Sequence, residues 1–424
     1  MKTSSTTALA VGVLVAVGLQ IPTAVAAEAL PATAASSYIA AQLAEGAVPA
    51  ASGTGKDYGL TLDAIIALDA LGVAGKAADT ALAEVHAQPL DPTNPWGAAK
   101  LIIAEIARGE TPSDTAVQIL TDSTDDSGAI TGDTTTQTNF GQALGVIALN
   151  RLAAANPTNT SLTHEAAAAT NYLASLQCTD STPNLNPSDI GGFTLYGSCA
   201  VDTPSVDPDT TGIAAQALLA ADNPAGRTAV TYLAHRALPN GAQDGKFTKA
   251  NANTTALAAS AFALAAQDSA VEGADAAYTQ AAGFLRSLQY GCDTPQTIAD
   301  QRGAIAYTST ADSNLAIHPE RADQLRRSTF QATFALAGAD LATYTRPATV
   351  NENPVPLTCT ANDNTGNSGD SGNTDNSGNT GNTDTSGSSG SGDNTGAIIG
   401  GVIGALVLIA AIVAGLIQVG IIRL

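Results

Sequence analysis

Basic side chains are scarce in this sequence. Its 424 residues include 17 Lys and Arg against 38 Asp and Glu, so the formal net charge is −21 and the pI is near 4.2. Nucleic-acid binding needs clustered Lys and Arg that neutralise phosphates, and anionic lipid surfaces attract the same residues. The composition therefore excludes a nucleic-acid partner, and the acidic balance is typical of a soluble extracellular domain.

The residue patterns of metal and nucleophile sites are also missing. The four cysteines form no Cys-x-x-Cys pair, so no metal site is expected. The four histidines are dispersed along the chain: His86, His164, His235 and His318. No Gly-x-Ser-x-Gly elbow is present that would mark a serine nucleophile. The predicted catalytic set is therefore empty, with Asp207 and Asp209 as weak candidates.

The two ends of the chain predict export and anchoring. Residues 1–27 contain Lys2, an apolar run and a small-residue Ala24-Val25-Ala26 site, which is typical of a signal peptide. Residues 397–422 hold a long apolar stretch followed by Arg423, which favours a transmembrane helix with a short cytoplasmic tail. The predicted location is the cell membrane of a bacterium, with the main domain outside.

Between that helix and the main domain, residues 361–396 are Asn, Gly, Ser, Thr and Asp with almost no apolar residue. Such a segment cannot bury a core and is expected to be a flexible linker. The folded domain is therefore expected at 28–360. Four cysteines in an exported chain favour two disulfides, for which three pairings are possible. We favour Cys178–Cys199, which would close an insertion, and Cys292–Cys359, which would hold the end of the domain.

A repeated helix start organises this domain. Asp209-Thr210-Thr211 opens an Ala-rich apolar segment, and Asn253-Thr254-Thr255 repeats it. Weaker copies begin near Asp57, Asn94, Thr138 and Arg327. A segment that is apolar on nearly all sides predicts a helix buried all round. A repeat of this size indicates an array of similar units.

A second, amphipathic helix and a turn precede several copies. The helices carry an aromatic residue followed by leucines and begin near Tyr38, Tyr172, Tyr232 and Phe284. The predicted turns start at Gly128, Gly191, Gly245 and Gly303. No segment indicates a run of strands, so the fold class is all-α. We expect about six inner and six outer helices in alternation, with cysteine-bearing insertions at about 179–208 and 291–326.

These motifs resemble the α/α-toroid superfamily, which includes squalene-hopene and terpenoid cyclases, protein prenyltransferase β subunits, cobalamin carriers and complement thioester domains. The resemblance lies in the helix ends at 172–177 and 284–289, the turns at 191–193 and 244–247, and the Asp/Asn-Thr-Thr starts, and it spans about 34–342. It implies an α/α toroid. These families have unrelated activities, so it does not imply one function.

The enzyme branches of that superfamily match only in part. Cyclases use Asp-x-Asp-Asp, and Asp207-Pro208-Asp209 is similar, but Thr210 stands at the last acid. Only 4% of residues are aromatic, which disfavours carbocation chemistry. Asp209 has a second interpretation as a helix N-cap, since Asn253 stands at the equivalent position. The prenyltransferase zinc set is missing, and Gln296 lies one residue too far from Cys292 for a thioester.

The cobalamin carriers are exported and non-catalytic, but they add a β domain that has no counterpart here. No cofactor is therefore predicted, and a cobalamin-like ligand is left open. In a closed ring, the inner-helix N-termini would form one mouth whose free N–H groups favour acceptors or anions. Binding residues are expected there: Asp57, Tyr58, Trp96, Asn139, Phe140, Asp209, Thr210, Asn253, Thr254 and Phe330.

The leading hypothesis is a membrane-anchored, non-catalytic surface protein that binds a small molecule or a protein at this mouth. Two alternatives are an extracellular enzyme that uses cavity carboxylates and a structural or adhesive module with a filled ring centre. A deep cavity with paired acids would favour the enzyme. A shallow mouth without such a pair would favour binding.

Overall fold

The computed structural model describes residues 30–132, 137–199, 205–245 and 249–359. The predicted signal peptide, the linker and the apolar C-terminal segment lie outside these ranges. The described residues form helices and isolated β-bridges and contain no strand, which confirms the all-α class. No helix of this part of the chain is both long and apolar enough to cross a membrane.

In the described residues, twelve α-helices alternate between two layers. Those that contact one another in series, here called inner helices, are α2 (Tyr58–Leu71), α4 (Pro95–Ala107), α6 (Asn139–Ala155), α8 (Pro208–Ala220), α10 (Ala252–Ala265) and α12 (Ala322–Leu336). The others, here called outer helices, are α1 (Ser36–Gln42), α3 (Gly75–His86), α5 (Asp114–Asp122), α7 (Thr160–Ser175), α9 (Pro224–Arg236) and α11 (Ala274–Ser287).

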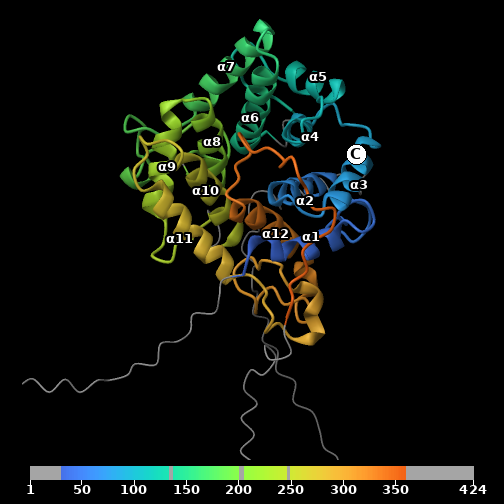
Figure 1. Cartoon of the computed structure of the whole chain (residues 1–424). Coiled ribbons are helices and arrows are strands. Elements are labelled where there is room, and N and C mark those ends of the chain that lie inside the picture. Colours follow the sequence, from blue (N-terminus) through green and yellow to red (C-terminus); the bar gives the residue numbers. More distant parts are fainter. Residues whose placement is uncertain (1–29, 133–136, 200–204, 246–248, 360–424) are drawn as a thin grey trace, which may run out of the picture.

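The inner series closes on itself. Each inner helix packs against the next in chain order, and α12 packs back against α2 (Figure 1). Each of α3, α5, α7, α9 and α11 packs on the inner helix before it, and α1 contacts both α12 and α2. Short 3₁₀ helices occur at Ala32–Ala35, Pro187–Asp189, Gln296–Gln301 and Pro319–Arg321. An inner helix is therefore covered on three sides by other helices.

Alanine makes this close packing possible. The residue ten positions after the N-cap is alanine in α2, α4, α6, α8 and α10, and the residue ten positions after Leu325, the equivalent position of α12, is alanine too. These residues are Ala67, Ala104, Ala148, Ala217, Ala261 and Ala335, and each is at most 1% exposed. A small side chain shortens the distance at which two helix axes can pack. The alanine layer therefore holds six helices close around one centre.

The helix starts differ in three places from the sequence prediction. Asp57, Asn94 and Thr138 are the N-caps of α2, α4 and α6, as expected. The caps of α8 and α10 are Asp207 and Asn251, so Asp209 and Asn253 lie inside the first turn. Pro208 explains the first shift, because its fixed φ suits the first helical position.

The last inner helix also begins earlier than predicted, at Ala322 in place of a start near Arg327. Asp323 accepts a hydrogen bond from Arg327 Nε at 2.7 Å, four residues along the helix. Ion pairs at this spacing stabilise a helical turn. The extra turn therefore belongs to α12 and not to the preceding insertion.

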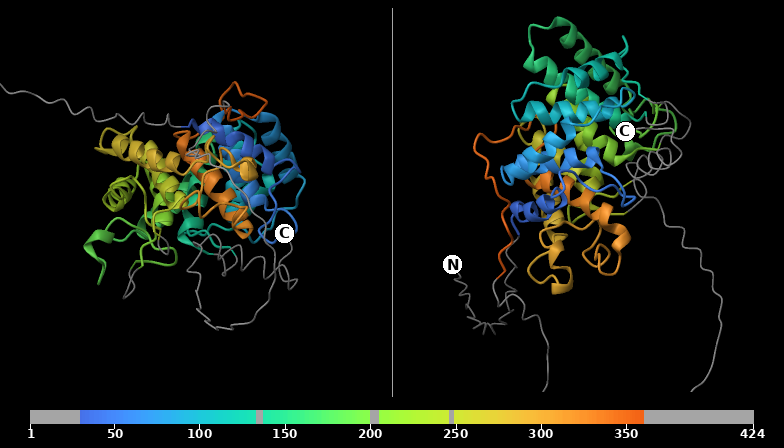
Figure 2. Two further views of the ribbon diagram at one scale, coloured as in Figure 1. Left: turned by 90° about the horizontal axis from the view of Figure 1, so that it is seen from below. Right: turned by 90° about the vertical axis from the view of Figure 1, so that its right-hand side faces the viewer.

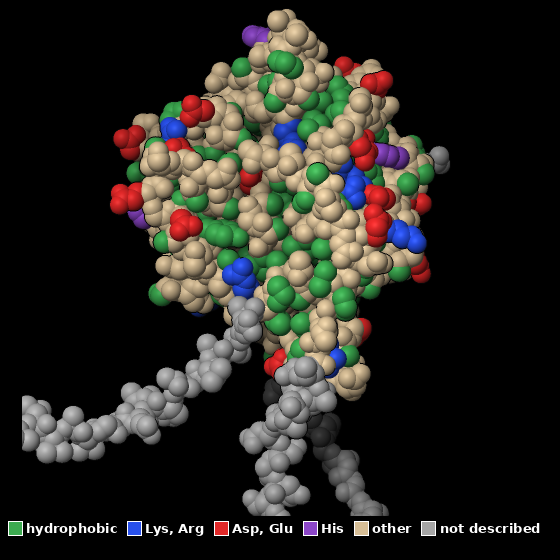
Figure 3. Space-filling view, in the orientation of Figure 1, with side chains coloured by type: hydrophobic (Ala, Val, Ile, Leu, Met, Phe, Trp, Pro, Cys, Tyr) green, Lys and Arg blue, Asp and Glu red, His purple; other side chains and the backbone are tan. Residues whose placement is uncertain are grey.

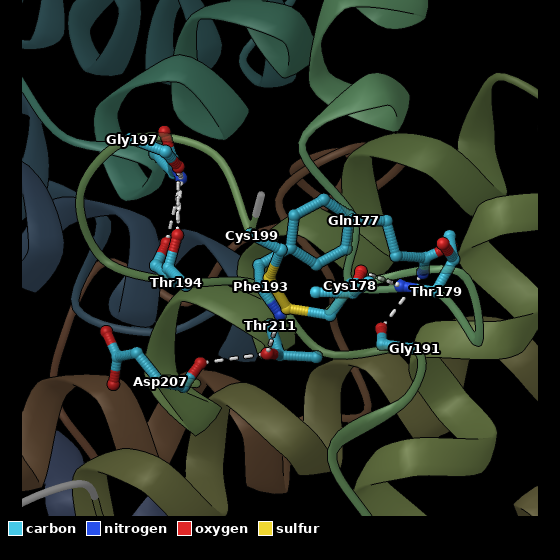
Figure 4. Close-up of a disulfide and its surroundings, with 12 residues drawn as sticks. Gln177, Cys178, Thr179, Gly191, Phe193, Thr194, Gly197, Cys199, Asp207 and Thr211 are labelled. Carbon is cyan, nitrogen blue, oxygen red and sulfur yellow. Dashed lines mark hydrogen bonds between the residues drawn. A yellow bond between two sulfur atoms is a disulfide. The ribbon is translucent and has the colours of Figure 1, made fainter. Parts of the chain in front are cut away.

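One hydrogen-bond pattern joins each turn to the inner helix that follows it. The Thr211 hydroxyl accepts the Phe193 N–H at 3.0 Å and donates to its own cap carbonyl at Asp207 (Figure 4). Thr61 and Thr255 make both bonds in α2 and α10. Thr329 of α12 accepts the Ile305 N–H and donates to the carbonyl of Leu325, four residues earlier in the helix. The Gln142 side chain accepts the Ile130 N–H in α6. The second threonine of the repeat therefore fixes the turn to its helix.

Glycine brings each turn against the next outer helix. Gly128, Gly191 and Gly303 have positive φ, and a Cβ on any of them would overlap neighbouring backbone. In the fifth unit this role belongs to Gly241, which packs on Gln280 of α11, and not to the predicted Gly245. Gly303 packs on Ala34, just before α1, so the same contact closes the outer layer.

Both predicted disulfides are confirmed. Cys178–Cys199 lies within the insertion between α7 and α8, with a Cα–Cα distance of 5.2 Å (Figure 4). Cys292–Cys359 joins the insertion between α11 and α12 to the end of the described chain, at 5.4 Å. A crosslink over 67 residues removes more freedom from the unfolded chain than one over 21. The second bridge therefore stabilises the end of the domain most.

Candidate binding site at the open end of the ring

The C-terminal segment closes one end of the ring. Residues 338–359, here called the strap, follow α12 and lie on one face of the molecule (Figures 1 and 2). Arg151 of α6 donates to the carbonyls of Leu341 and Tyr344 at 2.9 and 2.8 Å. Gln216 of α8 accepts the Leu341 N–H at 3.0 Å. The strap thus covers the C-terminal ends of the inner helices.

Charge pairs and aromatic contacts fix the strap there. The Tyr344 ring meets Phe334 edge-on at 5.2 Å and lies under Arg151 at 5.3 Å. Arg346 pairs with Asp69 of α2 at 3.1 Å, and burial raises the pKa of Asp69 to about 6 although Arg108 and Arg346 oppose the shift. This end of the ring is therefore filled. Acidic side chains on the face in Figure 3 are spread around its periphery and form no single patch.

The opposite end, where the inner helices begin, is here called the mouth. An inner helix is covered by two ring neighbours and an outer helix, so its fourth side faces the ring axis. In the first two turns of α8, every residue is buried except Asp209. The one such exception is Asn253 in α10 and Phe140 in α6. We infer that these side chains face the axis, because no other side of their helices is open.

The same reasoning applies to the remaining inner helices. Their partly exposed side chains near the helix start include Trp96 and Lys100 in α4, Asp63 in α2 and Gln331 in α12. The residues that line the mouth on this criterion are Asp63, Trp96, Lys100, Phe140, Asp209, Asn253 and Gln331. The mouth thus combines two aromatic, two amide and three charged side chains.

The mouth is shallow because the next level of the ring is packed. Nine positions after the N-cap, or after Leu325 in α12, every inner helix carries a buried residue: Ile66, Ile103, Ile147, Gln216, Ser260 and Phe334. An α-helix rises about 5.4 Å per turn. The partly exposed side chains that line the mouth therefore lie within about two turns of the N-cap, or of Leu325 in α12.

Four polar atoms at the mouth have no hydrogen-bond partner among the described residues. They are Trp96 Nε1, Asp209 Oδ1, Asn253 Oδ1 and Gln331 Oε1, and each is buried. Twelve other such atoms lie elsewhere in the described chain, and several of those side chains are bonded through another atom, as Arg151 and Gln243 are. Asp209 is likewise bonded, to Thr254. A buried polar atom without a partner costs about 1–3 kcal/mol. The four atoms at the mouth belong to four inner helices, which makes the mouth the candidate binding site.

Asp207 and Asp209 do not form a facing acid pair. Asp207 is 3% exposed, and its Oδ2 accepts the Thr210 hydroxyl at 2.6 Å. Asp209 alone reaches the mouth. Burial raises the pKa of Asp209 to about 7, the nearby Asp207 charge adds to the shift, and the Thr254 hydroxyl opposes it. The mouth therefore presents one carboxyl group that changes charge near neutral pH.

The cations at the mouth are already paired. Lys100 Nζ lies 2.8 Å from Asp63, and Arg327 contacts Asp57 at 2.9 Å and Asp323 at 2.7 Å. One first-turn N–H of each of α2, α4, α6 and α10 is accepted by the side chain of Asp57, Asn94, Thr138 or Asn251, whereas α8 and α12 have no side-chain cap bond. That the N–H groups at the mouth favour acceptors or anions stays a prediction.

Four of the ten predicted binding residues line the mouth, and the other six have different surroundings. Phe330 is fully buried and Thr210 is bonded to Asp207. Tyr58 reaches Glu84 of an outer helix, and Thr254 is buried beside Asp209. Asp57 forms an ion pair with Arg327 of α12. Asn139 donates hydrogen bonds to the insertion loop before α8. Helix position decides these differences, because each inner helix has one open side.

Sequence reasoning missed four residues. Three of them lie one turn deeper than the predicted set: Asp63, Lys100 and Gln331. The available signal was a polar residue six positions after the N-cap of α2 and α4, and six positions after Leu325 in α12. Tyr196 gave no repeat signal because it belongs to an insertion. It is 52% exposed, and Asn139 of α6 holds its loop through the carbonyls of Thr194 and Gly197 at 2.9 and 2.7 Å. Tyr196 therefore lies at the rim of the mouth.

Two further features of the described residues lie outside this site. A surface depression of about 330 Å³ is lined by Pro92, Thr93, Ser123, Thr131 and Gly132, in the loops before α4 and α6. It contains no ionisable side chain. Within the described ranges, no group of three or more His, Cys, Asp or Glu is placed to hold a metal ion.

Comparisons with known proteins give only a distant likeness. No protein-family model matches the chain, and no curated protein matches it. Among solved structures, a polysaccharide lyase is similar with a TM-score of 0.39 and 10% sequence identity, over 57% of this chain and 72% of that one. A likeness at this level carries no argument about fold or activity.

Proposed function

We propose that this protein is an α/α toroid that binds a ligand at its mouth without transforming it. The observation that carries the proposal is the group of unpartnered polar atoms on Trp96, Asp209, Asn253 and Gln331. A ligand that bonds to them would remove a cost that the free protein bears. The closed series of inner helices and the outer layer support the toroid assignment.

The depth of the mouth also supports binding. Below the second turn the ring is filled by buried side chains, so a ligand would sit at the surface end of the ring. Acid–base catalysis on a carbon skeleton commonly needs two groups that face the same reacting atom. Only Asp209 of the two candidate acids faces the mouth, since Asp207 is buried against Thr210.

An enzyme is the second candidate, and one observation favours it. The pKa of Asp209 is raised to about 7, which suits a general acid near neutral pH. In that case Asp209 would donate a proton to a substrate held by Asn253 and Gln331. The two candidates differ in what Asp209→Asn does, since a binding site tolerates an amide better than a proton donor does.

We propose that the domain acts outside the cell. The predicted signal peptide, linker and apolar C-terminal helix would export the domain and hold it at the membrane. The mouth would then meet ligands or partner proteins of the surroundings. Protease accessibility on intact cells tests the orientation, and cleavage of the domain only after lysis would contradict it.

The test of the binding proposal is ligand capture by the full-length protein. The protein would be purified in detergent under mild conditions and analysed by native mass spectrometry for bound small molecules. We expect a bound species that is lost in Asn253→Leu and kept in Asn159→Ala. Asn159 is a matched control because it caps an outer helix, α7, on the surface. If the same species stays bound to Asn253→Leu, the mouth is not the site. If Asp209→Asn retains binding but accumulates an unconverted species, the enzyme is correct.

A further inference from the structure

We propose that the ligand of the mouth is a neutral polyhydroxylated molecule, such as the end of an uncharged glycan. This inference rests on the proposed function and names its ligand class. It follows from three properties of the lining: the kind of hydrogen bond that is missing, the position of the aromatic residues and the state of the cations.

Three of the four unpartnered atoms are acceptors. Asp209 Oδ1, Asn253 Oδ1 and Gln331 Oε1 need donors, and only Trp96 Nε1 needs an acceptor. Phosphates and carboxylates are acceptors and would leave Asn253 Oδ1 and Gln331 Oε1 unpaired, and also Asp209 Oδ1 when that carboxyl group is ionised. A hydroxyl group donates one hydrogen bond and accepts others, so neighbouring hydroxyls satisfy the acceptors and the indole together.

The aromatic and polar parts of the lining lie on different sectors of the ring. Trp96 and Phe140 come from the adjacent helices α4 and α6, whereas Asp209, Asn253 and Gln331 come from α8, α10 and α12. The closeness of the first two helices is direct, because a Cβ on Gly141 would touch the Trp96 ring. A sugar ring has an apolar C–H face and a polar edge, so it can contact both sectors at once.

The charges at the mouth disfavour an anionic ligand. Lys100 is paired with Asp63, and Arg327 is paired with Asp57 and Asp323. An anion would have to displace one of these carboxylates. It would also approach a chain with a formal net charge of −21. Uronic acids and phosphates are therefore poorer ligands than neutral sugars.

Tyr196 extends the aromatic surface beyond the recess. It is one of two large hydrophobic side chains of the described chain that are well exposed, the other being Ile317. Asn139 fixes its loop to the start of α6, and the Cys178–Cys199 disulfide joins the same loop to the segment after α7. A second sugar unit could stack there while the first lies in the mouth. The ligand is thus expected to be an oligosaccharide.

The single tryptophan makes this testable without a label. Trp96 is the only Trp of the sequence, so intrinsic tryptophan fluorescence reports on the mouth. Full-length protein in detergent would be titrated with cellotetraose, maltotetraose and chitotetraose, and with tetragalacturonate, inorganic phosphate and spermidine as contrasting probes. We expect a saturable change with at least one neutral tetrasaccharide and none with the three charged probes.

Variants separate the ligand class from the site. Asn253→Leu and Gln331→Ala should each weaken neutral-sugar binding roughly tenfold, the equivalent of one lost hydrogen bond. Asn159→Ala should leave binding unchanged. Calorimetry gives a second measurement of affinity if a variant alters the fluorescence itself.

Each other outcome overturns the inference. A saturable response to tetragalacturonate, phosphate or spermidine, without one to a neutral sugar, overturns the ligand class but keeps the proposed function. Neutral-sugar binding that survives both mouth variants overturns the site. No response to any probe, while native mass spectrometry still finds a species lost in Asn253→Leu, also overturns the ligand class and again keeps the proposed function.

Discussion

Asp207 and Asp209 are two residues apart and have opposite roles. Asp207 is the cap residue of α8, buried and bonded to Thr210, and its carbonyl accepts the Thr211 hydroxyl. Asp209 is one of the few residues of α8 that is not buried, and its Oδ1 lacks a partner. Position on the helix separates them, because one faces the helix packing and the other faces the ring axis.

The raised pKa of Asp209 gives the residue a pH-dependent effect on stability. In the folded protein it holds its proton up to about pH 7, whereas in the unfolded chain it loses the proton near ~4. Its contribution to stability is therefore fully present below about pH 4 and is lost as pH rises through about 7.

Asp209→Asn removes this titration. The amide is compatible with the fold because Asn253 occupies the equivalent position in α10. We expect the variant to be more stable than the wild type by about 1–3 kcal/mol at pH 8 and nearly equal to it at pH 4. Urea unfolding at the two pH values measures the difference. A variant that is less stable at pH 8 would show that the carboxylate has a partner the structure does not contain.

At the scale of an element, the unit is an outer helix, a glycine turn and an inner helix. The turn is fixed from both sides. A threonine or glutamine of the inner helix accepts its backbone N–H, and its glycine lies against the backbone of the next outer helix. A larger residue in place of the glycine would overlap the outer helix, and an apolar residue in place of the threonine or glutamine would lose the hydrogen bond. The periodic glycines of the sequence therefore mark contacts between units as well as bends within them.

Gly303→Ala is expected to be strongly destabilising. The residue has φ +84°, and a Cβ would overlap the carbonyl of Ala34. A loss of about 2–4 kcal/mol follows from the strained backbone and the displaced neighbour. Gly283→Ala is the matched control, because Gly283 is exposed in the middle of α11 with nothing within 4 Å of its Cβ position.

The control should stabilise the protein by about 0.5–1 kcal/mol, since alanine favours the helix. Thermal unfolding of the two variants beside the wild type provides the measurement. Equal effects of the two substitutions would mean that the turn can move away from Ala34 at little cost.

At the scale of the molecule, closure distinguishes this fold from an open array of repeats. Helix α12 packs on α2, Arg327 reaches Asp57 across 270 residues of sequence, and Gly303 packs on Ala34. The strap then covers the C-terminal ends of the ring and is joined to the mouth-side insertion by Cys292–Cys359. The first and last units thus have the neighbours that end units of an open array lack.

Hydrogen exchange measured by mass spectrometry tests closure. In an open array the terminal units fray first. In the closed ring, α2 and α12 should be protected as strongly as α6 and α8. Reduction of the disulfides should first raise exchange in the strap and leave the inner helices unchanged. Faster exchange in α2 and α12 under oxidising conditions would contradict a closed ring.

The sequence by itself determined the helical class and the alternation of helices, which follow from the spacing of apolar residues and from the glycine turns. It favoured one of the three pairings that four cysteines allow, and the structure decided for that pairing. The sequence also pointed to the region around Asp209 as a special site. Boundaries were less certain, because Pro208 and the ion pairs of α12 shift helix starts by a few residues.

Only the tertiary structure decided which residues face the mouth. The sequence predicted both Trp96 and Phe330 as binding residues. Trp96 lies on the open side of its helix, whereas Phe330 is fully buried. The structure also paired Lys100 with Asp63 and Arg327 with Asp57, which leaves no free cation among the described residues that line the mouth. The physical reason is that each inner helix has a single uncovered side, and that side is set by its neighbours in the ring.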